Sequence, residues 1–251
     1  MKTVLITGAT AGIGKATAEI FAKNNYNVII TGRRKDRLDK LSKELQEKHK
    51  IKVLSLWFDV RKRSEVEKAI SSLEKDWRKI DVLVNNAGLA LGLSTIQEGN
   101  IDDWEIMIDT NIKGLLYVTR TIAPIMITNG SGHIINIGSV AGKETYPNGN
   151  VYCATKHAVD ALNKAMRIDM IQHGIKVTGI HPGMVETEFS LVRYKGDEER
   201  AKKVYSNFKP LMAEDIAETI YWAASRPDHV NISDLVLTPK AQASATIVKK
   251  D

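Results

Sequence analysis

The sequence predicts a doubly wound α/β fold, in which a seven-stranded parallel sheet carries helices on both faces. Three observations predict it. Short runs of β-branched residues alternate with longer stretches whose apolar residues recur every three or four positions. Two of the short runs, at residues 4–6 and 82–84, are apolar throughout, as is typical of strands buried on both faces. A glycine-rich turn directly follows the first run.

The expected elements follow one another in a regular order along the 251 residues. Strands are expected at residues 3–7, 27–31, 52–58, 82–85, 133–138, 176–181 and 235–238. Helices are expected between them, at residues 13–23, 35–49, 64–76, 102–128, 151–173 and 213–224. No repeat or linker divides the chain, so residues 1–251 are expected to form a single domain around one sizeable core.

Two segments fall outside this alternation. Residues 189–208 form a charged and aromatic insertion between the sixth strand and the last helix. Such an insertion is typical of a loop over a substrate site, although a solvated surface excursion explains it equally well. Residues 240–251 are expected to be a C-terminal extension that docks on a partner subunit or frays.

The composition excludes several classes of protein. There are 36 Lys and Arg against 30 Asp and Glu, which gives a net charge of +6, but the basic residues are scattered among acidic ones, as at residues 35–50. This pattern indicates solvated helix faces rather than a nucleic-acid surface. No run approaches the roughly 18 apolar residues of a membrane span, and the opening apolar run is too short for a signal peptide. A single cysteine cannot form an internal disulfide. We therefore expect a cytoplasmic protein without nucleic-acid or membrane partners.

The turn after the first strand has the spacing G-x-x-x-G-x-G, with Gly8, Gly12 and Gly14 at the fixed positions and Thr10 and Ile13 between them. Glycines permit a tight turn and a close approach of the backbone to a pyrophosphate. The helix that follows directs free N–H groups and the positive end of its dipole at the phosphates. Such a spacing also arises by chance, but its place between a strand and a helix favours a dinucleotide site.

Arg33 and Arg34 stand at the end of the second strand, where the adenosine ribose of a dinucleotide is expected. An acid at this place binds the ribose 2′-hydroxyl of NAD, whereas an arginine accommodates the 2′-phosphate of NADP. Without the glycine turn, the two arginines would indicate only the start of a surface helix. With it, the sequence favours NADP.

The third and fourth strands also end in residues suited to a ligand edge. Asp59 and Val60 follow the third strand, and Asn86, Ala87 and Gly88 follow the fourth. Because the carboxyl ends of parallel strands meet at one edge, where such sheets bind ligands, we expect these residues to contact the cofactor. A plain turn rich in Asn and Gly is the alternative.

Tyr152 and Lys156 lie four residues apart near the start of a helix and therefore share one face. The pair alone is weak evidence, because Tyr205 and Lys209 repeat it in the insertion, away from other catalytic candidates. Ser139, however, ends the fifth strand at the ligand edge, 13 residues before Tyr152. We expect the hydroxyl, the phenol and the ammonium to converge there.

This group suits the reduction of a carbonyl by hydride, which leaves an alkoxide that must gain a proton. A phenol with a pKa near ~10 is a poor base in the reverse direction, and lowering this pKa by about three units costs roughly 4 kcal/mol. An ammonium about 4 Å away, as expected of Lys156, contributes on that order, and an oxidised nicotinamide would add to it. Ser139 can donate a hydrogen bond to the substrate carbonyl, and Asn111 can hold a water that links Lys156 to solvent.

Together these motifs resemble the classical short-chain dehydrogenase/reductase family over almost the whole chain. The resemblance is carried by residues 7–14, Asp59, residues 85–88, Asn111, Ser139, Tyr152, Lys156, Pro182, Gly183 and Thr187. It implies a Rossmann-like fold and a catalytic tetrad of Asn111, Ser139, Tyr152 and Lys156, of which Tyr152 and Lys156 also contact the cofactor. It further implies that the nicotinamide is held by Pro182, Gly183, Val185 and Thr187. NADP-preferring members often carry a basic residue where this chain has Ala11, so the NADP preference rests on Arg33 and Arg34.

Residues 31–34, 86–92 and 188–197 more closely resemble the NADP-dependent 3-hydroxy acid dehydrogenase branch of this family. This resemblance implies activity on serine, allo-threonine and 3-hydroxypropionate, the reduction of malonic semialdehyde, and a homotetramer. A small acid needs a cation, and our hypothesis is that Arg193 on the insertion pairs with the substrate carboxylate while Ser139 and Tyr152 contact the reacting oxygen. An exposed arginine on a charged loop is an equally good interpretation of Arg193.

Two other functions share parts of the pattern. A 3-oxoacyl-thioester reductase, or another short-chain carbonyl reductase, would use the same tetrad, and the former would need a basic docking surface for an acyl carrier. A non-catalytic NADP-binding sensor would keep the glycine turn without needing the tetrad.

The six histidines show no ligand spacing, so no metal site is expected. Cys153 is expected to pack as a small side chain rather than to act as a nucleophile.

Overall fold

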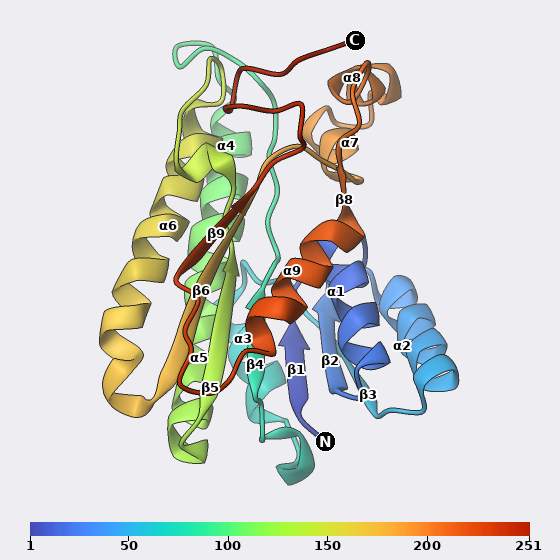
Figure 1. Cartoon of the computed structure of the whole chain (residues 1–251), viewed down its shortest axis with the longest axis vertical. Coiled ribbons are helices and arrows are strands. Elements are labelled where there is room, and N and C mark those ends of the chain that lie inside the picture. The colour runs from blue at the N-terminus through green and yellow to red at the C-terminus, as the bar shows by residue number, and fades with distance from the viewer.

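The computed structural model describes residues 1–251 and has the predicted seven-stranded parallel sheet at its centre (Figure 1). The strands lie in the order β3-β2-β1-β4-β5-β6-β9, and every neighbouring pair is parallel. Their bounds are β1 (Thr3–Ile6), β2 (Asn27–Gly32), β3 (Val53–Trp57), β4 (Val82–Asn85), β5 (Gly132–Ile137), β6 (Ile175–Pro182) and β9 (Asp234–Leu237). The carboxyl ends of all seven strands therefore meet at one edge, at the top of Figure 1.

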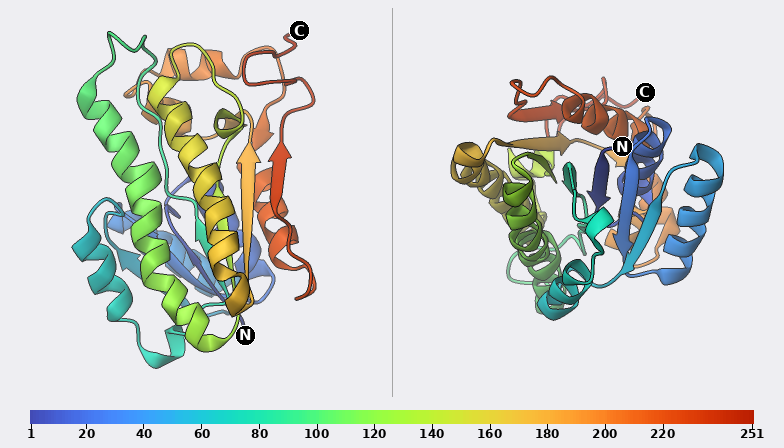
Figure 2. Two further views of the ribbon diagram at one scale, coloured as in Figure 1. Left: turned by 90° about the vertical axis from the view of Figure 1, so that its left-hand side faces the viewer. Right: turned by 90° about the horizontal axis from the view of Figure 1, so that it is seen from below.

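Helices cover both faces of this sheet (Figure 2). One face carries α1 (Gly12–Lys23), α2 (Lys35–His49) and α9 (Ala213–Ala224), and the other carries α3 (Arg63–Ser71), α5 (Leu115–Asn129) and α6 (Asn150–Met170). Successive residues of β1 face opposite layers: Val4 and Ile6 pack in the first core, and Leu5 packs in the second. A strand between two apolar layers needs apolar residues at every position, which explains the unbroken runs in the sequence.

Shorter elements lie over the carboxyl edge of the sheet. The predicted insertion contains α7 (Phe189–Arg193) and α8 (Glu198–Val204), and β7 (Val185–Glu186) pairs with β8 (Leu211–Met212) on either side of it. Figure 1 shows the C-terminal end of the chain close to α8. A hydrogen bond from the backbone N–H of Asp251 to the carbonyl oxygen of Asn207, at 2.9 Å, ties the two together. The edge of the sheet where ligands are expected is thus covered by the insertion and the C-terminal segment.

All seven strands lie within one residue of their predicted ends, whereas three helices differ. The helix predicted at 64–76 ends at Ser71, and a separate 3-10 turn, η1, follows at Lys75–Trp77. The helix predicted at 151–173 finishes in a 3-10 turn, η4 (Ile171–His173). The helix predicted at 102–128 consists of α4 (Ile101–Ile108), a π-helical turn, η2 (Asp109–Gly114), and α5. A single π-turn leaves the apolar spacing on either side nearly continuous, so the sequence pattern does not reveal it.

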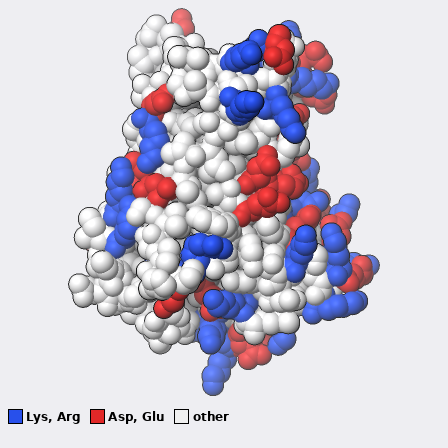
Figure 3. Space-filling view, in the orientation of Figure 1, with Lys and Arg blue, Asp and Glu red and all other residues white.

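Charged side chains of both signs are interspersed on the face shown in Figure 3. On α2, Lys40 pairs with Glu44 and Lys43 with Glu47, each at 3.9 Å, which confirms the solvated helix face predicted for residues 35–50. None of the helices combines the length and the apolar character needed to cross a bilayer.

Candidate active site

A cavity of about 490 Å³ opens at the carboxyl edge of the sheet, within the size range of small-molecule sites. It is lined by the loops after β1 to β5, by the start of α6 and by the segment from Pro182 to Arg193. All of the site residues predicted from the sequence line it except Gly14 and Asn111, which contact residues of its wall. The sequence motifs therefore converge on one place.

The glycine turn leaves room for a ligand beside its backbone. Gly8 and Gly12 have φ angles of +68° and +49°, a region that residues with side chains disfavour. A Cβ on Gly8 would lie 2.9 Å from Cα of Ala87, and one on Gly14 would overlap the carbonyl oxygen of Gly8. No side chain caps the start of α1, so its first N–H groups are left for another acceptor. This arrangement fits a pyrophosphate.

Asn86 holds the glycine turn from the end of β4. Its Nδ2 donates to the carbonyl oxygens of Thr7 and Gly8, at 2.9 and 3.2 Å. In return, Oγ1 of Thr7 accepts from the backbone N–H groups of Asn86 and Ala87, both at 3.0 Å. Asn86 lines the cavity as predicted, but its amide nitrogen is committed to the turn.

Arg33 and Arg34 line the cavity in different ways. Arg34 donates from Nε and Nη2 to Oγ1 of Thr10, at 3.1 and 2.7 Å, and from Nη1 to Glu188 at 2.9 Å. The guanidinium of Arg33 bonds to no other side chain, while its carbonyl oxygen accepts from the indole N–H of Trp57 at 2.9 Å. Two cations thus stand beside the glycine turn, as the recognition of a ribose phosphate requires.

Asp59 lines the cavity after β3 and is bound by Arg61. The Nε and Nη2 atoms of Arg61 donate to Oδ2 of Asp59 at 3.0 and 2.6 Å. Burial alone would raise the pKa of Asp59, but the hydrogen bonds from Arg61 outweigh it and lower the pKa below its usual value. The ionised carboxylate keeps lone pairs for a further donor.

Tyr152 is buried in the cavity wall. Burial raises the pKa of its phenol, and Tyr146 acts in the same direction, while a hydrogen bond from Ser139 and the charge of Arg193 lower it without compensating. Lys156 is not among the groups that shift this pKa most. In the protein on its own, burial of the phenol therefore dominates, and the phenol keeps its proton. The prediction that Lys156 and an oxidised nicotinamide together bring the pKa of Tyr152 toward neutrality stays a prediction.

Lys156 is buried near Tyr152, between the ends of β4 and β5. Its Nζ donates to the carbonyl oxygen of Ile137 at 2.9 Å, and a Cβ on Gly88 would lie 3.5 Å from it. Burial lowers the pKa of Lys156 to about 8. An ammonium has three donors, so one bonded carbonyl leaves two of them for a polar ligand.

Asn111 lies in the π-helical turn η2 and is buried. Its Oδ1 accepts from the backbone N–H of Leu89 at 2.9 Å. Its Nδ2 donates to the carbonyl oxygen of Leu89 at 2.9 Å and to Oγ1 of Thr155 at 3.0 Å. The side chain therefore ties the loop after β4 to α6, and both of its amide hydrogens are used. The Oδ1 atom accepts one hydrogen bond and keeps a second lone pair, so the water-holding role of Asn111 stays a prediction.

Arg193 extends from α7 into the cavity and is only partly exposed, unlike an arginine on a solvated loop. Its Nη2 donates to the hydroxyl of Tyr146 at 2.6 Å, and its Nε donates to the carbonyl oxygen of Gly92 at 3.3 Å. Its guanidinium carbon lies 5.3 Å from the ring centre of Tyr152. A cation is thus held beside the buried phenol.

The segment after β6 forms the wall that faces the glycine turn. Pro182, Gly183, Val185 and Thr187 all line the cavity, and a Cβ on Gly12 would lie 3.2 Å from the side chain of Thr187. Gln242 of the C-terminal segment supports this wall: its Oε1 accepts from the backbone N–H of Met184 at 2.9 Å. Sequence reasoning missed Gln242, because no local motif marks a residue that reaches the site from so far along the chain.

Further cavity residues lie in or near the insertion. Tyr205 lines the cavity, contrary to the expectation that it lies apart from the site. Its hydroxyl donates to the carbonyl oxygen of Val185 at 2.8 Å and lies 2.7 Å from Oγ of Ser190, so it supports the insertion. Tyr146 and Glu188 were also beyond the reach of motif analysis. Their roles depend on the distant partners Arg193 and Arg34.

Cys153 follows Tyr152 and is 1% exposed. Burial raises the pKa of its thiol, so the thiol stays protonated. The residue packs among apolar neighbours such as Leu89 and Ala141, which confirms the interpretation of Cys153 as a small packed side chain.

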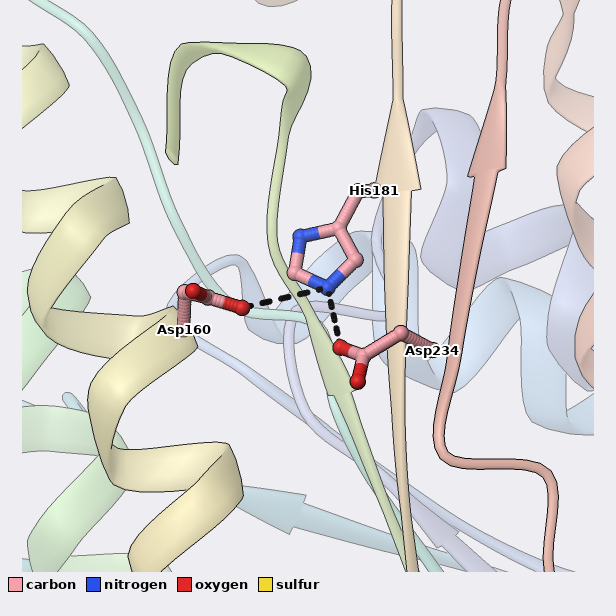
Figure 4. Close-up of side chains that lie close together, drawn as sticks. All are labelled: Asp160, His181 and Asp234. Atoms are coloured by element: carbon pink, nitrogen blue, oxygen red, sulfur yellow. Dashed lines mark hydrogen bonds and ion pairs between the residues drawn. The ribbon is translucent and has the colours of Figure 1, made fainter. Parts of the chain in front are cut away.

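A buried polar cluster lies next to Gly138, at the end of β5 (Figure 4). Nε2 of His181 lies 2.9 Å from Oδ1 of Asp234 and 3.7 Å from Oδ1 of Asp160. Burial lowers the pKa of His181, which favours its neutral form. The two carboxylates are paired with the cationic side chains of Lys143, Lys164 and Arg167. The cluster is therefore an ion-pair network that joins α6, β6 and β9.

Known proteins resemble this chain over nearly its full length. The family described as short chain dehydrogenase matches residues 2–197. The NADP-dependent 3-hydroxy acid dehydrogenase YdfG of Salmonella typhi is 50% identical over 243 residues, which cover 96% of each chain. Sulfoacetaldehyde reductase 2 of Chromohalobacter salexigens is 44% identical over 250 residues, which cover 99% of this chain and 98% of the relative.

Solved structures agree with these sequence similarities. The closed form of serine dehydrogenase complexed with NADP⁺ is similar with a TM-score of 0.92 and 45% sequence identity, over 99% of both chains. Similarity in sequence and similarity in fold thus point to the same kind of protein. The chain that shows both also contains the cavity, the glycine turn and the Ser–Tyr–Lys group. The protein belongs to the short chain dehydrogenase family.

Proposed function

We propose that the protein is an NADP-dependent oxidoreductase that interconverts the hydroxyl and carbonyl groups of small 3-hydroxy acids. The observation that carries the proposal is the position of Arg193, whose guanidinium carbon lies 5.3 Å from the ring of Tyr152 in the cavity that also contains the glycine turn. The relatives named 3-hydroxy acid dehydrogenase and serine dehydrogenase support the same substrate class.

The cavity has groups suited to each part of NADP. We assign the pyrophosphate to the glycine turn and the 2′-phosphate to the two arginines that follow β2. The residues proposed to hold the cofactor are Gly8, Thr10, Gly12, Ile13, Arg33, Arg34, Asp59, Val60, Asn86, Ala87, Gly88, Tyr152, Lys156, Pro182, Gly183, Val185 and Thr187, with Gly14 behind them. When bound, the nicotinamide supplies or accepts the hydride of the reaction.

Tyr152 is proposed to carry the proton that the reaction exchanges. Because burial raises the pKa of the phenol, Tyr152 is protonated at neutral pH and can give its proton to the substrate oxygen during reduction. Ser139 donates a hydrogen bond to the same oxygen as its negative charge develops. During oxidation the phenol has to lose its proton, and the positive charges of Lys156 and Arg193 favour that loss.

Arg193 is proposed to select acids as substrates. Tyr146 and Gly92 occupy its Nη2 and Nε atoms, which leaves Nη1 for a substrate carboxylate. The short distance from the guanidinium to the Tyr152 ring suits a substrate whose carboxylate and reacting carbon are separated by few bonds. A long acyl thioester would place no anion at Arg193.

A sulfonate-bearing aldehyde is a second candidate substrate. The similarity to sulfoacetaldehyde reductase 2 covers nearly the whole chain. A sulfonate also presents anionic oxygen atoms that can accept the same charge-assisted hydrogen bonds from Arg193 as a carboxylate.

We further propose that the protein is a cytoplasmic homotetramer in which residues 189–208 act as the substrate loop. Trp222 on α9 and Val236 on β9 are 44% and 55% exposed, and an exposed apolar face at an open sheet edge supports association between subunits. The contacts of Arg193 inside the cavity support the role of the insertion. The cytoplasmic location rests on the sequence features given above.

A substrate panel tests the proposed reaction. NADP⁺ reduction is measured with L-serine, L-allo-threonine and 3-hydroxypropionate, and NADPH oxidation with sulfoacetaldehyde and an acetoacetyl thioester. We expect turnover of the 3-hydroxy acids and slower turnover when NAD⁺ replaces NADP⁺. Activity on the thioester alone would replace the proposal with a thioester reductase, and nucleotide binding without any turnover would indicate a sensor.

The substitution Tyr152→Phe tests the proton-carrying role. It should lower kcat by about 10²- to 10⁴-fold, because the phenolic proton is lost, while the affinity for NADPH changes little. The comparison variant is Tyr205→Phe, which removes a hydroxyl that bonds to Val185 in the same cavity, and its kcat should fall by less than about tenfold. Retention of wild-type kcat by Tyr152→Phe would contradict the mechanism.

A further inference from the structure

The two arginines assigned to the 2′-phosphate are not equivalent. The guanidinium of Arg33 bonds to no side chain. The guanidinium of Arg34 uses all three of its nitrogen atoms: Thr10 accepts from its Nε and Nη2, and Glu188 accepts from its Nη1. Arg34 thus holds an anionic group at the place where a phosphate is expected to bind.

Glu188 reaches this place from the opposite wall of the cavity. It stands between β7 and α7, 154 residues from Arg34 in the sequence. Its Oε2 lies 2.9 Å from Nη1 of Arg34, and its Oε1 lies 2.7 Å from Nη1 of Arg37. The carboxylate lines the cavity together with Thr10 and Arg33, so its charge faces the region assigned to the ribose.

We propose that Glu188 is a specificity-determining residue whose carboxylate competes with the 2′-phosphate of NADP for Arg34 and thereby moderates the preference for NADP over NAD. The proposal rests on the proposed function, in which the 2′-phosphate binds beside Arg33 and Arg34. Glu188 is expected to weaken the binding of a nucleotide that carries this phosphate and to leave the binding of one that lacks it nearly unchanged.

Electrostatics gives the direction of the effect. A phosphate monoester carries between one and two negative charges at neutral pH and pairs strongly with arginine. To reach Arg34 it has to displace the carboxylate of Glu188 or remain beside it, and like charges repel in either case. The 2′-hydroxyl of NAD carries no charge and leaves the Glu188–Arg34 pair in place.

The exposure of the pair sets the size of the effect. The side chains of Arg34, Arg37 and Glu188 are each about two-fifths exposed, and exposed ion pairs contribute little because water and salt screen them. A group held this weakly can be displaced by a phosphate. The change of affinity should therefore be modest, about two- to fivefold, and should become smaller at high ionic strength.

The test compares the full-length wild type with Glu188→Gln, which keeps the shape of the side chain and removes its charge. Dissociation constants are measured by titration calorimetry for NADPH and NADH, and for the fragments 2′,5′-ADP and 5′-AMP, at low and high salt. In Glu188→Gln, the Kd of NADPH and 2′,5′-ADP should fall about two- to fivefold, and the Kd of NADH and 5′-AMP should stay within the error of the wild type. The matched control is Glu186→Gln, an exposed glutamate two residues away that forms no ion pair, and it should change none of these constants.

A second variant ties the effect to Arg34. In an Arg34→Gln background, the substitution Glu188→Gln should tighten NADPH binding less than it does in the wild type, because the carboxylate and the phosphate no longer compete for Arg34 and only the repulsion between them remains. Weaker NADPH binding by Glu188→Gln would overturn the proposal and indicate that Glu188 organises the arginines for the phosphate. Equal changes for NADPH and NADH would also overturn it, and would indicate that Glu188 instead helps to hold the insertion in place. If the wild type binds NADH as tightly as NADPH, the proposed NADP preference itself fails, whatever the variants do.

Discussion

Burial acts in opposite directions on the two central ionisable side chains of the site. It raises the pKa of Tyr152 and lowers the pKa of Lys156 to about 8. In each case the neutral form is favoured, because a charge in a poorly hydrated wall is costly. Without a ligand, the site thus holds a neutral phenol beside an ammonium whose proton is held less tightly than usual. The protonation of both groups should change when a charged ligand binds.

The low pKa of Lys156 predicts how the stability of the nucleotide-free protein depends on pH. Lys156 titrates near pH 8 in the folded chain and near 10.5 when unfolded, so between these values the unfolded chain binds more protons and the unfolding free energy rises with pH. Relative to Lys156→Met, the wild type should gain about 1 kcal/mol between pH 7 and pH 9, or about 2–4 °C in Tm.

Thermal unfolding of both proteins across this pH range checks the prediction. Tyr152 does not interfere, because its pKa is raised from 10 and its contribution to stability is lost only at higher pH. Parallel pH profiles for the two proteins would mean that Lys156 is better solvated than its burial indicates.

The contacts of Arg193 predict a selective effect on acidic substrates. Arg193→Ala should raise the KM for 3-hydroxypropionate by about 10- to 100-fold, because a hydrogen bond to a charged group contributes roughly 1.5–3 kcal/mol. The KM for a neutral secondary alcohol should change much less. Steady-state kinetics checks both values. Arg200→Ala is the control, since Arg200 lies on the same insertion and stacks on Tyr194, 4.5 Å from its ring centre. Equal increases for the acid and the alcohol would discard the role of Arg193.

Residues in local motifs could be predicted from the sequence, and residues defined by distant partners could not. Gly8, Ser139 and Tyr152 are marked by their spacing and by their places at strand ends, and all three line the cavity. Gln242 and Glu188 act through contacts with Met184 and Arg34. Such contacts exist only after the chain has folded, so no spacing in the sequence predicts them. The pKa of Tyr152 was beyond prediction for a related reason, because it depends on how deeply the phenol is buried.

The periodicity of apolar residues predicted every strand and helix of the central layers. It failed where the backbone hydrogen bonding changes but the spacing of apolar residues does not. The π-helical turn η2 lies inside a continuous apolar stripe, yet it buries Asn111 beside Leu89. The strands β7 and β8 are two residues long, which is too short for an alternating pattern to be seen. Both features lie next to the cavity, where function rather than regular packing shapes the backbone.

The start of α1 predicts a sharp effect of one methyl group. Gly14→Ala should strengthen an isolated helix by about 1 kcal/mol, but the new Cβ would overlap the carbonyl oxygen of Gly8 and crowd Nδ2 of Asn86. The glycine turn would have to shift, so the Kd for NADPH should rise more than about tenfold.

Calorimetric titration measures this Kd, and circular dichroism checks that the variant is folded. Lys15→Ala, an exposed change at the next position of the same helix, should leave the Kd unchanged. A Gly14→Ala variant that binds NADPH like the wild type would show that the turn is more adaptable than its contacts indicate.

For the molecule as a whole, the parallel sheet brings all strand ends to one edge, and the chain returns to that edge twice more, in the insertion and in the C-terminal segment. The outer edge of β9, the last strand of the sheet, pairs with no further strand. Val236 on β9 is 55% exposed, although most residues of the neighbouring strand β6 are buried. An open strand with an apolar side chain is suited to pairing with another subunit.

The proposed homotetramer predicts that Val236→Arg reduces the size of the assembly. A charge in an apolar interface is costly to desolvate, so the native mass should fall from that of a tetramer to that of a dimer or monomer. Size-exclusion chromatography with light scattering measures the mass. Lys40→Glu on the solvated face of α2 is the control and should keep the wild-type mass. A monomeric wild type would refute the assembly itself, and an unchanged mass of Val236→Arg would exclude the β9 edge as the contact.

The burial of Cys153 has a practical consequence for labelling the insertion. The chain contains one cysteine, and that thiol is shielded from reagents. A cysteine introduced at Lys202, an exposed position of α8, would therefore be the one accessible thiol for a maleimide dye. Fluorescence from such a labelled protein would report whether this region changes its surroundings when a ligand binds, and Cys153 would not have to be replaced first.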